Sequence, residues 1–146
     1  MRVSVIGGSS VPDEVYDRTE EIGYQLGRRG HTVVCGGLTG VMRAICEGVN
    51  NGGGTTIGIL PGENYNGANA FVDVPIATGM GHARNALVVM NGEVVVAIDG
   101  GPGTLSEIGF AQVFGKPLVG VGTHDVPGIE TVDTPEEVVE FVEANE

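Results

Sequence analysis

Short apolar runs rich in β-branched residues alternate along the chain with segments in which apolar residues recur every three or four positions. The short runs are bounded by Gly, Pro or polar residues, which is the pattern of strands. We predict strands at residues 3–6, 32–35, 56–60, 72–76, 94–98 and 118–121. Because these runs are apolar throughout rather than alternating, they indicate a parallel sheet that is covered on both faces.

Helices are predicted between most of these strands. The first spans residues 13–29, places Val15, Ile22 and Leu26 on one stripe, and is followed by Gly30 as a stop. Two more are expected at about 40–50 and 80–90, and a fourth from Thr104 to a point before residue 115. The last begins with Thr134 as N-cap, followed by a proline at the first helical position and a glutamate that closes a capping box.

The alternation of strands and helices predicts an α/β fold. We expect a single-domain, doubly wound, mainly parallel sheet flanked by helices, Rossmann-like in the broad sense, over residues 1–146. The longest irregular stretch, residues 61–73, is expected to be a surface loop near the site.

Glycine clusters follow the predicted strands at the ends where ligands bind in open α/β sheets. Backbone N–H groups in such loops, together with the N-terminus of the next helix, can hold a phosphate without any lysine. An ordinary set of tight turns is the alternative explanation. The candidate phosphate-binding residues are Gly8, Ser9, Ser10, Gly36, Gly37, Thr39, Gly40, Arg43, Gly81, Gly100, Gly101, Gly103 and Thr104.

Other phosphate motifs fit poorly. A P-loop needs a lysine at the start of a helix, whereas Lys116, the only lysine, precedes a predicted strand. The dinucleotide fingerprint is approximated only by Gly101, Gly103 and Ser106, after the fifth strand instead of the first.

Charge narrows the range of partners. With 19 acidic residues against 7 Lys and Arg, the formal net charge is -12, which disfavours nucleic acid and anionic membranes. Adaptation to high salt is one explanation of this surface, and an ordinary acidic cytosolic protein is the other. No signal peptide or membrane span is recognisable, so we expect a cytoplasmic protein with Cys35 and Cys46 as buried, reduced thiols.

Several motifs together resemble one known family. "GGPGTLSE" resembles the PGGxGTxxE signature of the LONELY GUY phosphoribohydrolases and their relatives, long labelled lysine decarboxylase-like. "VIGGSS", "GGLTGVMRA" and "ARNALVV" are similar to further family segments. Across nearly the whole chain the resemblance is greatest to the short branch that includes molybdenum-cofactor carrier proteins.

This resemblance implies a Rossmann-like homo-oligomer, a dimer or tetramer, that binds a nucleotide or a phosphorylated pterin. The phosphoribohydrolases of the family cut the N-glycosidic bond of nucleoside 5′-monophosphates, and motif matching places their catalytic arginine and glutamate on Arg84 and Glu107. Two positions depart from the hydrolase pattern: Asp99 replaces the signature proline, and Asn85 replaces a lysine that usually follows the arginine.

The chemistry of the two matched residues suits glycosidic cleavage. A carboxylate can stabilise the oxocarbenium-like transition state, and the planar guanidinium of Arg84 can clamp a phosphate. As alternatives, Glu107 could close a capping box with Thr104, and Arg84 could form a surface salt bridge. A Schiff-base lysine is missing at the glycine loops, which argues against pyridoxal-phosphate decarboxylation. No catalytic cofactor or metal is expected, and His31, His82 and His124 show no metal spacing.

Two functions from different classes therefore remain open. As an enzyme, the protein would hydrolyse a nucleoside 5′-monophosphate; as a binding module, it would carry or sense a phosphorylated ligand such as molybdenum cofactor. Arg84 and Glu107 favour the enzyme, whereas Asp99 and Asn85 favour the carrier.

Overall fold

The computed structural model describes residues 1–146 and is built on one seven-stranded sheet. All neighbouring strands pair in parallel, in the order β4-β3-β2-β1-β5-β6-β7. The predicted Rossmann-like α/β fold is thus confirmed, with a sheet that is parallel throughout. The strands are β1 Arg2–Gly7, β2 Thr32–Cys35, β3 Thr55–Leu60, β4 Val74–Ala77, β5 Val94–Ile98, β6 Leu118–Val121 and β7 Glu130–Thr131.

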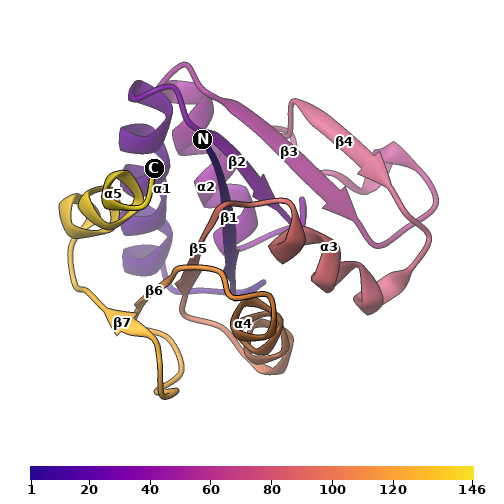
Figure 1. Cartoon of the computed structure of the whole chain (residues 1–146). Helices are drawn as coiled ribbons and strands as arrows, with labels where there is room; N and C mark the ends of the chain where they lie inside the picture. The colour runs from indigo at the N-terminus through magenta and orange to yellow at the C-terminus, as the bar shows by residue number, and fades with distance from the viewer.

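Five helices cover the two faces of the sheet (Figure 1). Helices α1 Asp13–Arg28, α2 Val41–Asn51 and α5 Pro135–Ala144 share one hydrophobic core with one face. Helices α3 Asn85–Met90 and α4 Pro102–Val113 pack with the other face in a second core. The strand β1 serves both, since Val3 and Val5 belong to the first core and Ile6 to the second.

The helix-end signals in the sequence work as predicted at two places. Gly30 follows α1 with a φ of 78°, the left-handed conformation that glycine adopts without a steric cost. At the start of α5, the Thr134 hydroxyl accepts a hydrogen bond from the Glu137 backbone N–H at 3.2 Å. The predicted N-cap of the last helix is therefore confirmed.

Two predicted elements differ from the structure, and one strand is additional. The strand predicted at 72–76 is β4, which begins at Val74, and the two-residue strand β7 is not predicted because its exposed residues carry no apolar pattern. The helix predicted at 80–90 is divided into a short 3-10 helix, η2 Gly81–Arg84, and α3. Gly81 has a φ of 59°, so a regular α-helix cannot include this residue.

Helix α4 begins two residues earlier than predicted. It starts at Pro102, with Gly101 as N-cap, instead of at Thr104. Proline is favoured at the first helical position because its φ is fixed near the helical value and its missing N–H is not needed there. The capping box between Thr104 and Glu107 is therefore wrong, and Glu107 lies in the second turn, not in the first.

The chain reverses direction across the sheet at β1. From β1 it proceeds through β2 and β3 to β4 at one edge, and it then returns to place β5 on the other side of β1. The boundary between β1 and β5 is therefore the topological switch point, where ligands bind in this class of fold. None of the helices is long and apolar enough to span a bilayer.

Candidate functional site

A cavity of about 290 Å³ opens at the carboxyl ends of the central strands, beside the switch point. The loops that follow β1, β2 and β5 converge on it, and the segment η2 together with the start of α3 closes its remaining side. Its lining comprises Val5, Ile6, Gly7, Gly8, Ser9, Gly36, Leu38, Met42, His82, Arg84, Asn85, Gly101, Pro102, Gly103, Thr104 and Glu107.

Glu107 is a buried carboxyl group on the wall of this cavity. Helix α4 carries it, and only 8% of the residue is exposed. Its side chain takes part in none of the hydrogen bonds between protein groups, and it lines the cavity, where its oxygens can meet a ligand. Burial raises the pKa of Glu107 to about 8, against the opposing effect of the positive charge on Arg84. At neutral pH the carboxyl group is therefore mostly protonated in the empty cavity.

Arg84 is the second buried charged residue of the cavity, with 7% of its surface exposed. Its Nε donates to the carbonyl of Ile59 at 2.9 Å, one terminal nitrogen donates to Asn85 Oδ1, and the other donates to the Gly36 carbonyl at 3.4 Å. Burial lowers the pKa of Arg84, while the nearby Glu107 raises it. These bonds fix the plane of the guanidinium at the cavity wall, although it makes no direct ion pair with Glu107.

The N-terminus of α4 provides the most open part of the lining. A methyl group added at Gly101 would meet no protein atom within 4 Å, and at Gly103 only the Asn85 amide nitrogen, at 3.9 Å. Open space therefore borders the first turn of a twelve-residue helix. The backbone N–H groups of a first turn and the helix dipole attract an anion.

The structure brings only part of the predicted phosphate-binding set to the cavity. Residues of that set in the lining, together with the two candidate catalytic residues, are Gly8, Ser9, Gly36, Arg84, Gly101, Gly103, Thr104 and Glu107. Predicted residues outside the lining are Ser10, Gly37, Thr39, Gly40, Arg43, Gly81 and Gly100.

Some of the residues outside the lining hold the loops together. The Thr39 hydroxyl donates to the Ser9 carbonyl at 2.8 Å, and the Val41 N–H donates to the Gly8 carbonyl at 2.9 Å. The loops after β1 and β2 are thereby joined. Arg43 points elsewhere, since its guanidinium carbon lies 5.0 Å from the centre of the Phe71 ring.

Gly100 lies outside the cavity lining, but the loop after β5 requires a glycine at this position. Its φ is 111°, and a methyl group there would lie 2.3 Å from the Thr104 hydroxyl oxygen. The preceding Asp99 also has a positive φ, 51°, and its N–H donates to the Val121 carbonyl at 3.2 Å. Proline could adopt neither this φ nor this hydrogen bond. The backbone conformation of this loop therefore requires a residue other than proline at position 99, where the signature has proline.

Three lining residues had weaker signals in the sequence. Asn85 was noted only as a departure from a motif, yet its side-chain oxygen accepts from Arg84 and its amide lies near Ser106 at 3.5 Å. Met42 follows the glycine loop within the first turn of α2, and His82 is exposed at the cavity rim. No three His, Cys, Asp or Glu side chains are close enough together to hold a metal ion.

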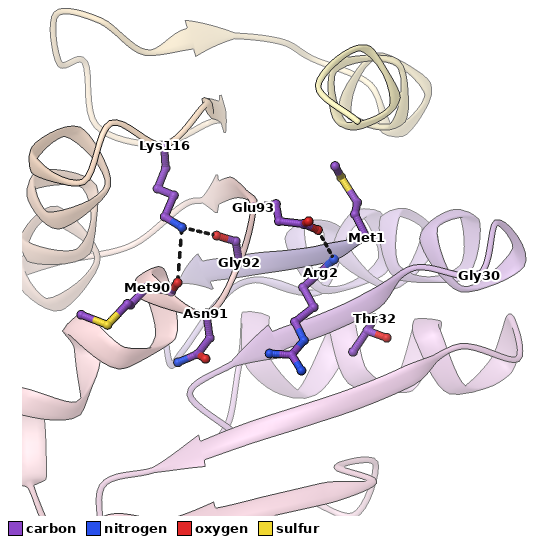
Figure 2. A pocket seen from close by; sticks show the side chains of 9 residues that line it. All are labelled: Met1, Arg2, Gly30, Thr32, Met90, Asn91, Gly92, Glu93 and Lys116. Atoms are coloured by element: carbon purple, nitrogen blue, oxygen red, sulfur yellow. Dashed lines mark hydrogen bonds between the residues drawn. The ribbon is translucent and has the colours of Figure 1, made fainter.

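A larger cavity, of about 500 Å³, lies at the other end of the central strands, near their amino ends (Figure 2). The Lys116 ammonium group points to its wall and donates to the carbonyls of Met90 at 3.3 Å and Gly92 at 2.8 Å. Lys116 therefore caps the C-terminus of α3, far from the glycine loops. We place the candidate site in the smaller cavity, because buried charged groups and open helix N–H groups meet only there.

Comparison with known proteins shows the family and the fold of this chain. A family model described as the SLOG cluster4 family matches residues 1–146. An uncharacterized protein of Archaeoglobus fulgidus is 37% identical over 142 residues, which cover 97% of this chain and 93% of that protein. A probable cytokinin riboside 5′-monophosphate phosphoribohydrolase of Oryza sativa subsp. japonica is 35% identical over 139 residues, and the match covers 90% of this chain but 59% of that protein.

Solved structures resemble the whole chain. The molybdenum cofactor binding protein of Rippkaea orientalis has a TM-score of 0.92 at 29% identity, covering 98% of this chain and 95% of that chain. The molybdenum cofactor carrier protein of Chlamydomonas reinhardtii has a TM-score of 0.89 at 29% identity, covering 98% and 96%.

Proposed function

Because the chain belongs to the SLOG cluster4 family, we propose that it binds a nucleoside 5′-monophosphate in the cavity at the N-terminus of α4 and hydrolyses its N-glycosidic bond. The observation that carries this proposal is Glu107, a buried carboxyl group in the cavity with no hydrogen-bond partner from the protein. Burial of a carboxyl group without a hydrogen-bond partner costs free energy, and buried polar groups are normally hydrogen-bonded. Such a group in a cavity is therefore a candidate for a functional role.

The phosphate of the ligand would lie against Gly101 and Gly103. The open space there borders the first turn of α4, and the partial positive charge of the helix N-terminus compensates for the lack of a lysine. Arg84 adds a full positive charge to the lining of the cavity. An anion can thus bind within a protein of net charge -12 because the local field comes from dipoles and one arginine.

The carboxyl group of Glu107 would act on the glycosidic bond. In its protonated form it can donate a proton to the leaving base while the bond between the base and the ribose breaks. The carboxylate that remains then stabilises the positive charge on the sugar and accepts a proton from the water that attacks it. The products are the free base and ribose 5-phosphate.

The experiment is incubation of the purified protein with a panel of nucleoside 5′-monophosphates and detection of free base by liquid chromatography. We expect release from at least one of them, and Glu107→Gln should slow it by about a hundredfold or more. Thermal-shift binding of the same nucleotides to the Gln variant shows whether the ligand still enters. If no base is released at low or high KCl, the proposal of hydrolysis is refuted.

A second candidate function is that of a carrier of molybdenum cofactor. It is favoured by structural neighbours with this role that cover the chain almost end to end, whereas the match to the rice phosphoribohydrolase covers 59% of that protein. It is also favoured by Asn85, whose side-chain oxygen occupies one of the donors of Arg84. Cofactor that co-elutes with the protein in gel filtration, without any base release from nucleotides, would decide for the carrier.

We also propose that the protein assembles as a homo-oligomer through the outer face of α4. Large apolar side chains are exposed there although no charged residue lies on this face; they are Leu105, Phe110, Val113 and Phe114. An apolar, uncharged face is the part of a strongly acidic molecule where a second copy can approach without repulsion.

A further inference from the structure

The two cysteines of the chain lie in contact beneath the candidate site. Cys35 is the last residue of β2, directly before the loop that lines the cavity, and Cys46 lies on α2. Both are fully buried, and their sulfur atoms are 3.5 Å apart. The sulfurs would have to approach by only about 1.5 Å to reach the length of a disulfide bond.

The two thiols are not equivalent. Cys35 Sγ accepts a hydrogen bond from the Gly37 N–H at 3.4 Å. The hydrogen bond with Cys46 lowers the pKa of Cys35, with further help from the Gly37 N–H and the charge of Arg84. The same hydrogen bond, together with burial, raises the pKa of Cys46. Burial of Cys35 and the charge of Glu107 oppose this lowering, but Cys35 remains the more acidic of the two thiols.

The Cys35 sulfur lies close to the wall of the cavity. Gly36, its neighbour in sequence, and Met42 both line the cavity, and the Cys35 thiol lies 3.9 Å from the Met42 carbonyl oxygen. The sulfur therefore lies directly behind residues of the cavity wall. Because Cys35 is fully buried, an oxidant must be small and must enter through a local movement of these residues.

We propose that Cys35 and Cys46 form an oxidative modification site, in which a small hydroperoxide converts the thiol pair into an intramolecular disulfide beneath the glycine loop after β2. The Cys35 thiolate attacks the peroxide, the O–O bond breaks, and a sulfenic acid forms as hydroxide leaves. Cys46 then attacks the Cys35 sulfur, the S–S bond forms, and the sulfenic oxygen leaves as water with the Cys46 proton taken up. In sum, two thiols and one hydrogen peroxide give one disulfide and two waters.

The disulfide would alter the loop that borders the cavity. Once bonded, Cys35 Sγ must move toward Cys46, which changes its hydrogen bond with the Gly37 N–H. Asn69 holds the same loop from the other side, because its amide donates to the Leu38 carbonyl at 2.9 Å and its N–H donates to the Gly37 carbonyl at 2.9 Å. The Cys35 sulfur is therefore coupled, through Gly37, to a loop that borders the cavity.

The test is treatment of the native protein with hydrogen peroxide, followed by thiol alkylation and mass spectrometry. We expect loss of both free thiols together, a mass decrease of two hydrogens, full reversal by dithiothreitol, and a peptide that links Cys35 to Cys46. The Cys46→Ser variant should stop at a sulfenic acid on Cys35, which dimedone traps when it is added together with urea after the peroxide is removed, and Cys35→Ser should not react at Cys46. Survival of both thiols under conditions that oxidise the urea-unfolded chain, or over-oxidation of Cys35 with Cys46 left free, would overturn the proposal.

A second measurement concerns the site and rests on the proposed function. Adenosine 5′-monophosphate should bind to the oxidised protein roughly tenfold more weakly than to the reduced protein, with recovery after reduction. Disulfide formation is scored without any nucleotide, so a protein that binds none of the nucleoside 5′-monophosphates of the panel refutes the proposed function and leaves the modification site standing. Equal affinity of the two forms would refute the coupling to the loop.

Discussion

At the scale of single residues, the candidate site depends on glycines with opposite roles in one turn. Gly103 lies in α4 in front of open space, whereas Gly100 has a φ of 111° and no room for a side chain. A side chain at position 103 would therefore affect the space for a ligand, whereas a side chain at position 100 would affect the stability of the fold.

Alanine at each of these positions should give opposite results. Gly103→Ala should fold and gain up to about 0.5 kcal/mol from reduced chain entropy, while its methyl group obstructs the phosphate and weakens nucleotide binding by tenfold or more. Gly100→Ala should lose about 1–3 kcal/mol of unfolding free energy because of its strained φ and its contact with Thr104. Urea denaturation measures the stability and calorimetric titration the binding. Unimpaired binding by Gly103→Ala would contradict the location of the phosphate.

The protonation of Glu107 predicts how stability varies with pH. Its pKa is raised from 4.5 to about 8 in the folded chain, so the folded state holds a proton that the unfolded state has lost between these values. Its contribution to stability is therefore present below pH 4.5 and is lost as the pH rises to 8 and above. One pKa unit corresponds to about 1.4 kcal/mol, which makes the loss on the order of a few kcal/mol.

The matched variant for this effect is Glu107→Gln, which resembles the protonated acid but does not ionise. We expect the variant to be close to the parent in stability near pH 5 and more stable at pH 9, as measured by urea denaturation at both values. His31, whose pKa is lowered by burial, titrates in both proteins and cancels in the comparison. Parallel stability curves for the two proteins across this range would show that Glu107 is not buried as described.

At the scale of elements, the apolar runs were enough to predict six of the strands. A parallel strand that is covered on both faces needs a short, continuous run of apolar residues, and such runs stand out in the sequence. The start of α4 was not found, although Pro102 carried the usual signal of a first helical residue. The strand β7 depends on pairing with β6, and the left-handed φ of Gly81 excludes this residue from the helix predicted at 80–90. Both are properties of the folded chain.

The same limit applies to the site. The sequence indicated which loops meet at the cavity, since the carboxyl ends of parallel strands share one edge of the sheet. It did not indicate which residues of each loop face inward. Gly37, Thr39 and Gly40 join the loops to each other, while Met42 and Asn85 face the cavity, and this division depends on the turn geometry of each loop.

The packing of α1 on α2 is a further property of elements with a test of its own. A methyl group at Gly48 would lie 2.0 Å from the backbone oxygen of Glu20, so the helices are in backbone contact there. Gly48→Ala should destabilise the protein by at least 1–3 kcal/mol, because neither backbone can yield cheaply. Gly109→Ala in α4, which meets no atom within 4 Å, should instead stabilise it by about 0.5–1 kcal/mol. Thermal unfolding of both variants checks the pair, and a neutral Gly48→Ala would contradict this packing.

At the scale of the whole molecule, the proposed oligomer requires the outer face of α4. Val113 is 80% exposed, so Val113→Asp should leave the folded monomer intact while placing a charge at the centre of the contact. We expect the variant to sediment as a monomer where the parent sediments as a dimer or tetramer. Tyr65→Asp, at another exposed apolar residue, is the control and should not change the mass. A parent that is monomeric at all concentrations would refute the proposed interface.

The net charge of -12 affects the whole fold, because mutual repulsion of carboxylates favours the expanded chain. Salt shortens the range of this repulsion from about 10 Å at 0.1 M to about 3 Å at 1 M. We therefore expect the midpoint of thermal unfolding to rise as KCl increases from 0.1 to 2 M, as in a protein adapted to high salt. A variant that neutralises three exposed carboxylates, with Asp125→Asn, Asp133→Asn and Glu140→Gln, should start higher at low salt and rise less steeply. A flat or falling curve for the parent would contradict salt adaptation and leave an ordinary acidic protein, whereas equal slopes for parent and variant would assign the rise to salt effects other than screening.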